Sequence, residues 1–208
     1  MRLLVVTAVA AERDAISAAL PEDSGTVVFA GGVGPASAAA SASAALAADP
    51  SFDAVLSAGI AGGFDVPIGA VVVASAVAFA DLGAETEDGF AAVSSLGFGF
   101  DRLDVPPALT AALARRTGAT VGTVLTVATA TGTEATLAAR RDRHPDAVAE
   151  AMEGFGVATA AVVHGVPFAE VRTISNPVGP RDRASWRIPD ALVALGQAFA
   201  AITKEPLP

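Results

Sequence analysis

Ala151-Met152-Glu153-Gly154-Phe155 and Ile174-Ser175-Asn176-Pro177 are the two segments of the sequence that decide the fold. The first segment is predicted to open a helix, and the second to end a buried strand about twenty residues later. A helix followed by a buried strand is a unit of α/β proteins. In such proteins the carboxyl ends of the strands meet at one edge of the sheet, where ligands bind. The two segments therefore predict a ligand site at that edge.

The rest of the chain repeats the same alternation of short β-branched runs with Ala-rich helical patterns. Strands are expected at residues 3–9, 26–30, 54–57, 70–79, 120–127 and 168–175. Helices are expected at residues 11–20, 35–48, 107–117, 134–143, 153–164 and 189–203. The strands read as continuous apolar runs, which is typical of strands covered on both faces. The alternation predicts a single domain over residues 1–208, with a three-layer α/β/α fold around a mixed, largely parallel, twisted sheet.

The composition limits the kinds of partner. The chain has 208 residues, of which 52% are hydrophobic and 17% charged, so we expect a dense core and a homodimer or higher homo-oligomer that hides apolar surface. A net charge of −9 repels nucleic acid. The absence of Cys excludes disulfides and thiolate chemistry and fits a cytoplasmic location. Residues 1–10 resemble a secretion signal, but they run straight into an amphipathic helix and are predicted to be the first strand. No apolar run approaches the ~18 residues that a membrane span needs.

Three Gly-rich segments, 31–34, 59–63 and 97–100, are expected to be turns near strand ends, where glycine lets a backbone approach a ligand. The first contains Gly32-Val33-Gly34-Pro35, which lacks the third glycine and the distant acidic residue of a dinucleotide fingerprint. We expect this loop to present N–H groups to a ligand hydroxyl or a water. Residues 81–100 show no clear period and are interpreted as a mobile flap.

Few side chains offer other chemistry. His144 precedes a proline and His164 ends a predicted helix, so both are interpreted as structural. No His/Asp/Glu cluster has metal-ligand spacing, and no nucleophile elbow is present, so neither a metal nor a cofactor is expected.

Two glutamates remain as candidates. Glu12 is either a solvated residue that the helix dipole favours or a carboxylate held at the ligand edge just after the first strand. Glu153 has small and apolar neighbours, which indicates burial, and a buried carboxylate needs donors that vicinal sugar hydroxyls would supply. With Asn176 at the next strand end, three polar groups would converge on the glycosidic bond of a nucleoside.

These elements carry a resemblance over the whole chain. The Glu12 junction, Gly32-Val33-Gly34-Pro35, Ala58-Gly59-Ile60-Ala61-Gly62-Gly63 and Met152-Glu153-Gly154 resemble the purine nucleoside phosphorylase/uridine phosphorylase superfamily, closest to its methylthioadenosine/S-adenosylhomocysteine nucleosidase branch. The run from Ser175 to Arg183 is similar to that of the branch members that hydrolyse futalosine to hypoxanthine and dehypoxanthine futalosine in menaquinone biosynthesis.

The resemblance implies roles. Glu12 would activate the hydrolytic water, Glu153 would hold the ribose 2′- and 3′-hydroxyls, and Met152 would pack on the sugar. Gly62 would line the pocket through its backbone, and the 129–132 loop, with Thr131 and Gly132, would form a wall of the base site. Asn176 would face the base, where nucleosidases for adenine nucleosides carry an acidic residue. Direct proton donation from that position is therefore in doubt.

Three questions stay open at this level. The Gly-rich segments 30–34 and 57–60 contain no Arg or Lys for a phosphate, which favours water over phosphorolysis. A nucleosidase for adenine-type thionucleosides, or a nucleoside-binding regulatory protein on the same fold, are the alternatives. Arg181, Arg183 and Arg187 either hold a substrate carboxylate at the 5′ end or pair with Asp182 and Asp190 on the surface.

Overall fold

The fold is built around one large mixed sheet. The computed structural model describes residues 1–205 and 207–208, and its main sheet runs in the order β10-β4-β8-β9-β3-β1-β2, with β7 paired to β4. The bounds of these strands are β1 Leu3–Thr7, β2 Thr26–Ala30, β3 Ala54–Gly63, β4 Val71–Phe79, β7 Arg102–Asp104, β8 Thr120–Thr126, β9 Ala147–Ala151 and β10 Phe168–Pro177. Most neighbouring strands are parallel, whereas β10–β4, β3–β9 and β4–β7 are antiparallel. A mixed, largely parallel sheet is confirmed.

Part of this sheet closes on itself, which the sequence did not predict. Strand β10 pairs with both β3 and β4, and β9 pairs with both β8 and β3, so β3, β10, β4, β8 and β9 form a ring. Strand β3 is long enough to pair with β1 at its beginning and with β9 at Gly62 and Gly63. Register shifts interrupt three of the pairings in the ring, and such bulges bend a sheet strongly.

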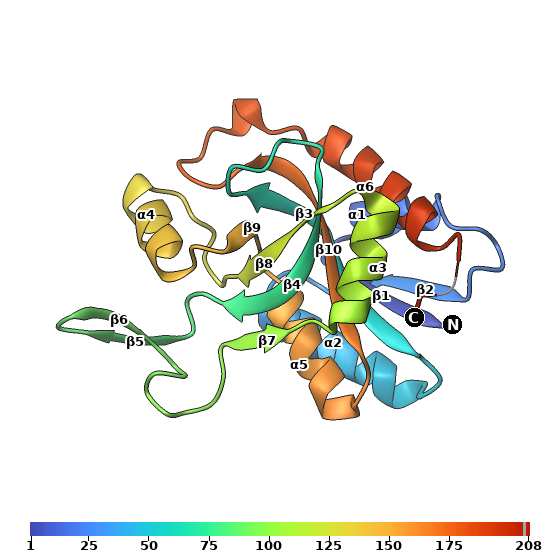
Figure 1. The fold of residues 1–208 in the computed structure, drawn as a ribbon, viewed down its shortest axis with the longest axis horizontal. Coiled ribbons are helices and arrows are strands. Elements are labelled where there is room, and N and C mark those ends of the chain that lie inside the picture. Colours follow the sequence, from blue (N-terminus) through green and yellow to red (C-terminus); the bar gives the residue numbers. More distant parts are fainter. Residues whose placement is uncertain (206) are drawn as a thin grey trace.

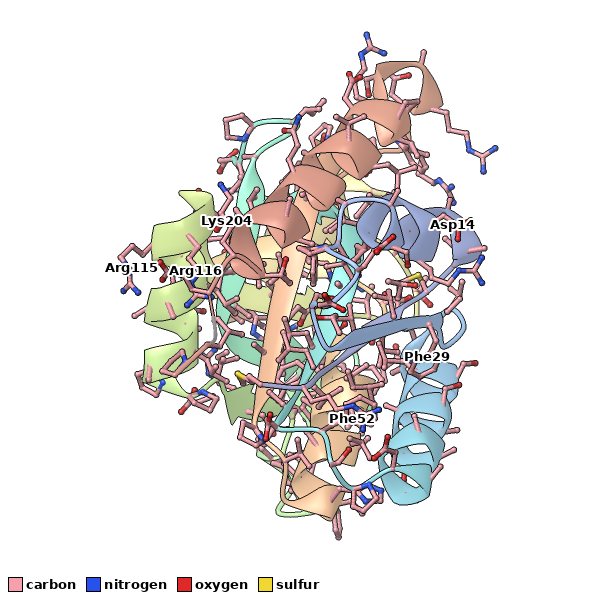
Figure 2. The ribbon with its side chains drawn as sticks, turned by 90° about the vertical axis from the view of Figure 1, so that its right-hand side faces the viewer. Asp14, Phe29, Phe52, Arg115, Arg116 and Lys204 are labelled. Carbon is pink, nitrogen blue, oxygen red and sulfur yellow. The ribbon has the colours of Figure 1, made fainter. Side chains whose placement is uncertain are left out.

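Helices cover both sides of the sheet (Figure 1). Helices α2 and α5 pack against each other beside β1 and β3, while α1 and α6 form a second pair, and α3 packs on both α6 and β4. The helices are α1 Ala10–Ser17, α2 Pro35–Ala48, α3 Pro107–Thr117, α4 Glu134–Arg143, α5 Gly154–His164 and α6 Ile188–Ile202, with a short 3-10 turn at Arg183–Ser185. Seen from the side, α6 and α1 lie together in Figure 2, where Asp14 marks α1. The layered α/β/α arrangement is confirmed.

Local signals explain where several helices begin and end. Pro35 and Pro107 stand in the first turns of α2 and α3, where the missing N–H costs no hydrogen bond. Gly118 and Gly165 end α3 and α5 in the left-handed conformation, at φ of 67° and 66°. All six predicted helices and all six predicted strands are present, and the differences in their bounds are largest at β3.

The structure corrects the prediction in three places. Residues 59–63 are not a turn, because β3 continues through them to Gly63. The segment interpreted as a flap contains a two-stranded hairpin, β5 Gly83–Thr86 with β6 Gly89–Ala92, which projects from the body of the molecule (Figure 1). Strands β7 and β9 were not predicted, since they are short and β9 contains only one β-branched residue.

The core joins the sheet to both helical layers. Residues of β1, β3, β4, β8 and β10 are buried together with the inner faces of α2, α3, α5 and α6. This rigid core fixes the ends of β1, β3, β9 and β10 relative to one another. Within the described chain no helix is both long and apolar enough to cross a membrane.

Candidate active site

A cavity of about 260 Å³ lies where β1, β3, β9 and β10 end. Seven of the residues predicted from the sequence line it: Glu12, Gly62, Thr131, Met152, Glu153, Asn176 and Arg181. These residues are separated by up to 169 positions in the chain (from 12 to 181), so the fold brings them together. The other candidates from the sequence, Gly132, Arg183 and Arg187, are not among the residues that line the cavity.

Glu12 is a buried carboxylate at the first turn of α1, with 4% of its surface exposed. Its Oε2 accepts the backbone N–H of Ala8 at 3.0 Å and of Val9 at 3.2 Å, and its Oε1 accepts the N–H of Ile60 at 2.9 Å. The solvated alternative for Glu12 is therefore excluded. These three donors hold the carboxylate between β1 and β3, at the cavity wall.

Glu153 is also buried, at the N-terminus of α5, as predicted. The hydrogen-bond donors that Glu153 needs in its buried position are supplied by the protein, whereas the sequence pattern predicts that sugar hydroxyls supply them. Oε1 accepts the N–H of Gly34 at 3.1 Å, and Oε2 accepts the N–H of Met152 at 3.3 Å and an N–H of the Arg172 guanidinium at 3.2 Å. The N–H of Gly34, expected to face a ligand or water, is thus used to position Glu153. Oε1 retains an open acceptor site towards the cavity.

Arg172 is the central residue that the sequence reasoning missed. It lies within β10, is 1% exposed, and donates to Glu170 at 2.7 Å, to Glu153 at 3.2 Å and to the Ser57 hydroxyl at 2.9 Å. Burial opposes its charge, but Glu170, Glu153 and Glu12 outweigh burial and raise the pKa of Arg172. The signal was available, because Glu170 and Arg172 stand two apart in an apolar strand and so share one face.

Two glycines make room for this charged group. A Cβ on Gly59 would collide with the Glu12 carboxylate and lie 2.9 Å from a guanidinium nitrogen of Arg172. A Cβ on Gly154 would collide with the Glu170 carboxylate. The glycines of β3 therefore serve close approach of side chains within a strand, which explains why they do not form the predicted turn.

Glu170 is fully buried beneath the start of α5. Its Oε1 accepts from Arg172, while Oε2 has no hydrogen-bond partner among the residues that the structure describes. Burial raises the pKa of Glu170; Arg172 opposes this rise, and the neighbouring Glu153 adds to it. A carboxyl group that is so poorly solvated favours its neutral form more than an ordinary glutamate does.

Asn176 reaches the cavity because β10 has a bulge. Ile174 pairs with Ala61 and Asn176 with Gly62, so Ser175 is an extra residue between them. Such a bulge reverses the faces of the residues that follow it. The Ser175 hydroxyl lies 2.7 Å from the Oδ1 of Asn176, and the Asn176 amide donates to the Pro177 carbonyl at 2.9 Å. One amide hydrogen of Asn176 remains for a ligand.

The 129–132 loop is held by carboxylates. Glu150 of β9 accepts the backbone N–H of Thr131 at 2.8 Å and its hydroxyl at 2.6 Å, and it forms a buried ion pair with Arg140 of α4. Asp81 accepts the N–H groups of Ala128 and Thr129. Glu150 also lines the cavity and was not a predicted site residue.

The arginines after Asn176 surround one aromatic ring. The guanidinium groups of Arg181 and Arg183 lie 5.4 and 5.9 Å from the centre of the Trp186 ring. Arg181 and Trp186 line the cavity together with Ile188. Asp182 instead caps the short 3-10 turn. Arg187 donates to backbone carbonyls of Ala184 and Trp186.

The two histidines lie outside the cavity. His164 is 2.9 Å from the Ser43 hydroxyl, and half-buried His144 caps the end of α4. Burial lowers the pKa of His144, and Arg143 adds to this effect. Within the described residues, no cluster of three or more His, Asp or Glu is arranged to hold a metal ion.

Known proteins with similar sequences identify the family of this chain. The model of the phosphorylase superfamily matches residues 12–207, nearly the whole chain. The chain belongs to the phosphorylase superfamily. It is 53% identical to a futalosine hydrolase of Streptomyces coelicolor, over 97% of this chain and 95% of that protein. It is 44% identical to a futalosine hydrolase of Acidothermus cellulolyticus, over 97% and 90% of the two chains.

Solved structures confirm the superfamily fold. A methylthioadenosine/S-adenosylhomocysteine nucleosidase of Colwellia psychrerythraea, in complex with adenine, matches with a TM-score of 0.83 at 21% identity, over 98% of this chain and 94% of that one. A futalosine hydrolase of Helicobacter pylori matches with a TM-score of 0.83 at 16% identity, over 99% and 98%. The phosphorylase superfamily therefore supplies the fold, and the cavity residues supply the chemistry.

Proposed function

We propose that this protein is an N-glycosidase that hydrolyses futalosine to hypoxanthine and dehypoxanthine futalosine, a step of menaquinone biosynthesis. The observation that carries the proposal is the convergence of buried Glu12, buried Glu153 and Asn176 on one cavity. Two futalosine hydrolases are 53% and 44% identical to this chain over 97% of its length. We treat residues 1–208 as one nucleosidase domain.

Hydrolysis needs a water activated beside the ribose C1′ atom. Glu12 takes a proton from this water, whose oxygen bonds to C1′ as the bond from C1′ to the base breaks. The electron pair of that bond leaves with hypoxanthine, which departs with anionic character and takes a proton from water. Each Glu12 oxygen can accept two hydrogen bonds, and Oε1 has one protein donor, so a site for the water is open. A general base contributes about 10²–10⁴-fold to a rate. The rest comes from carboxylates that stabilise the developing ribosyl cation and from binding of the departing base.

Glu153 binds the 2′- and 3′-hydroxyls of the ribose, and Met152 packs on the sugar. The Gly34 and Met152 N–H groups and Arg172 fix the orientation of Glu153, so it meets the sugar without first having to be ordered. Hydrogen bonds to this carboxylate strengthen as the ribose becomes positive. Binding of the sugar therefore favours the transition state over the ground state.

Water is a better nucleophile than phosphate in this cavity. Phosphorolysis needs cations for a phosphate dianion beside C1′. The cation nearest Glu12 and Glu153 is Arg172, which is fully buried and already occupied by Glu170, Glu153 and Ser57. Arg181 lines the cavity beside Trp186, at the segment that follows Asn176. A phosphate beside Glu12 would also be repelled by its carboxylate.

The base lies beside Asn176 and Gly62, against the loop that holds Thr131 and Gly132. A 6-oxopurine presents acceptors at O6 and N7, to which an amide can donate, whereas a carboxylate would set lone pairs against lone pairs. Asn176 therefore favours hypoxanthine over adenine as the leaving base. This preference separates the proposal from a nucleosidase for adenine-type thionucleosides.

The substrate carboxylate at the 5′ end pairs with Arg181, while Arg183 lies against the same Trp186 ring. Arg181 lines the cavity, and the ring that both arginines contact offers an apolar face to an aromatic group. A bidentate pair between guanidinium and carboxylate gives both affinity and orientation.

We also propose that the protein is cytoplasmic and forms a homodimer or larger homo-oligomer. The side chains of Phe98, Val162, Val163 and Val193 are 58–81% exposed. These side chains lie at the end of α5, in α6 and in the loop after β6, and an oligomer would remove such apolar surface from water. The absence of Cys fits a reducing compartment.

Incubation of the pure protein with futalosine, inosine and methylthioadenosine, with and without phosphate, tests the function. We expect hypoxanthine to be released from futalosine at a rate that does not depend on phosphate. Release of a ribose 1-phosphate product, or cleavage of methylthioadenosine in preference to futalosine, would contradict the proposal.

A further inference from the structure

Glu150 is a third buried carboxylate that lines the cavity, besides Glu12 and Glu153. Gly62 of β3 is the register partner of Asn176 in β10 and also of Glu150 in β9. The three residues therefore form a row across three adjacent strands, about 4.8 Å apart. Partners in register point to the same side of a sheet, and Gly62 has no side chain. The row places an amide and a carboxylate on either side of Gly62, with the Val178 side chain packed over this glycine, and all four residues line the cavity.

The hydrogen bonds of Glu150 leave it one open position. Its Oε2 accepts the Thr131 hydroxyl and a guanidinium N–H of Arg140, and its Oε1 accepts the Thr131 N–H at 2.8 Å. A carboxylate oxygen accepts two hydrogen bonds, so Oε1 can accept one more. Every protein neighbour named here is a donor, which leaves Glu150 as an acceptor for its ligand. Its exposed 7% gives that ligand access from the cavity.

The arrangement matches one edge of a lactam purine. A 6-oxopurine carries an N1–H donor next to its O6 acceptor, whereas a 6-aminopurine carries an N1 acceptor next to an amino donor. An acceptor at Glu150 and a donor at Asn176 therefore complement the first base and oppose the second. We propose that Glu150, held by Arg140, is a specificity-determining residue that accepts the N1–H of hypoxanthine. The inference rests on the proposed function, since it names the base contact of that same site.

A purely structural role for Glu150 leads to a different expectation. Asp81 holds the same loop through the N–H groups of Ala128 and Thr129 and is not among the residues that line the cavity. If Glu150 only held Thr131, its loss would weaken every base alike. If Glu150 accepts a hydrogen bond from N1–H of the base, its loss changes the ratio of the affinities for hypoxanthine and adenine. Asp81→Asn is thus a matched control for Glu150→Gln.

The test is calorimetric titration of the native protein with hypoxanthine, 1-methylhypoxanthine and adenine. We expect 1-methylhypoxanthine and adenine to bind at least ~10-fold more weakly than hypoxanthine, since an unmatched buried hydrogen bond costs about that factor. In Glu150→Gln the amide oxygen stays with the Thr131 hydroxyl and Arg140, so the amino group replaces Oε1, loses the hydrogen bond from the Thr131 N–H and presents a donor to the base. The preference for hypoxanthine over adenine should then fall at least ~10-fold, whereas Asp81→Asn should keep the native ratio.

Several outcomes would overturn the assignment. They are equal binding of hypoxanthine and 1-methylhypoxanthine, a Glu150→Gln protein that weakens both bases by one factor, and no binding of hypoxanthine at millimolar concentration. If Glu150→Gln does not fold, the native comparison with the methylated base decides. Binding of the free bases does not depend on whether the protein cleaves futalosine. A protein that prefers hypoxanthine to 1-methylhypoxanthine but does not hydrolyse futalosine would therefore refute only the proposed function.

Discussion

Two buried Arg–Glu groups flank the cavity, and they differ in charge balance. At the sugar end, Arg172 forms ion pairs with Glu170 and Glu153, and the charge of Glu12 also acts on it. At the base end, Arg140 pairs with Glu150 and touches the partly exposed Asp81 at 3.5 Å. The excess of negative charge lies where glycosidic cleavage creates a cation. The base end holds two carboxylates and one guanidinium, and one of these carboxylates, Asp81, is partly exposed. Under the proposed function, the sugar end serves catalysis and the base end serves specificity.

The largest effect is expected for Glu12→Gln. If Glu12 deprotonates water, the amide should lower kcat at least ~10²-fold while KM and the preference among bases stay close to native. Steady-state kinetics on futalosine checks this expectation. Asp14→Asn is the control, since Asp14 lies on the same helix but projects to solvent, where it pairs with Arg13 (Figure 2). Near-native turnover of Glu12→Gln would remove Glu12 from the mechanism and leave the comparison without its catalytic half.

The next effect concerns the ribose hydroxyls. Hydrogen bonds to a charged group are worth about 1.5–3 kcal/mol, which corresponds to roughly 10–100-fold. Glu153→Gln should lower kcat/KM by that factor, and a 2′-deoxy substrate should be equally poor for the native protein. Glu153→Gln should lower kcat/KM for the 2′-deoxy substrate only slightly further. Both changes remove the same hydrogen bond between Glu153 and the 2′-hydroxyl, so their effects should not add. Equal rates on ribo and deoxyribo substrates would disprove this role.

A smaller effect separates the two arginines on Trp186. Both contact the ring, but only Arg181 lines the cavity, which makes Arg183→Ala a control for Arg181→Ala. We expect Arg181→Ala to raise KM for futalosine about 10-fold and to leave any slow activity on inosine, which has no 5′ carboxylate, almost unchanged. The measurement is the ratio of kcat/KM values for the two substrates. If neither variant changes it, the carboxylate is bound elsewhere, for example by a neighbouring subunit.

The smallest effect is on stability, and it concerns Glu170. Because burial raises its pKa in the folded state, Glu170 contributes most below the ordinary carboxyl pKa, and this contribution is lost as pH rises through the raised value. Each unit of the rise corresponds to about 1.4 kcal/mol. Relative to Glu170→Gln, the native protein should therefore lose free energy of unfolding between acidic and neutral pH. Urea denaturation across that range measures the difference, and a relative gain at neutral pH would contradict the assignment.

The sequence predicted the residues at strand ends better than those inside strands. Glu12, Glu153 and Asn176 follow apolar runs, so their place at the ligand edge could be inferred from the pattern alone. Arg172 and Glu150 lie within strands, where pairing across distant segments decides what a charge contacts. Residues 59–63 were interpreted as a turn because glycine is common in turns, yet contacts from Glu12 and Arg172 keep Gly59 in a strand. Long-range packing, which no local pattern encodes, made the difference.

The central claim is that this cavity hydrolyses a 6-oxopurine nucleoside, and one ratio tests it most directly. The measurement is kcat/KM of the native protein on futalosine against its 6-amino analogue, aminodeoxyfutalosine, in phosphate-free buffer. One mismatched buried hydrogen bond costs about 1–3 kcal/mol, so we predict that futalosine is preferred at least ~10-fold and that Asn176→Asp moves the ratio towards the amino compound. Equal or faster hydrolysis of the amino compound by the native protein would contradict the account.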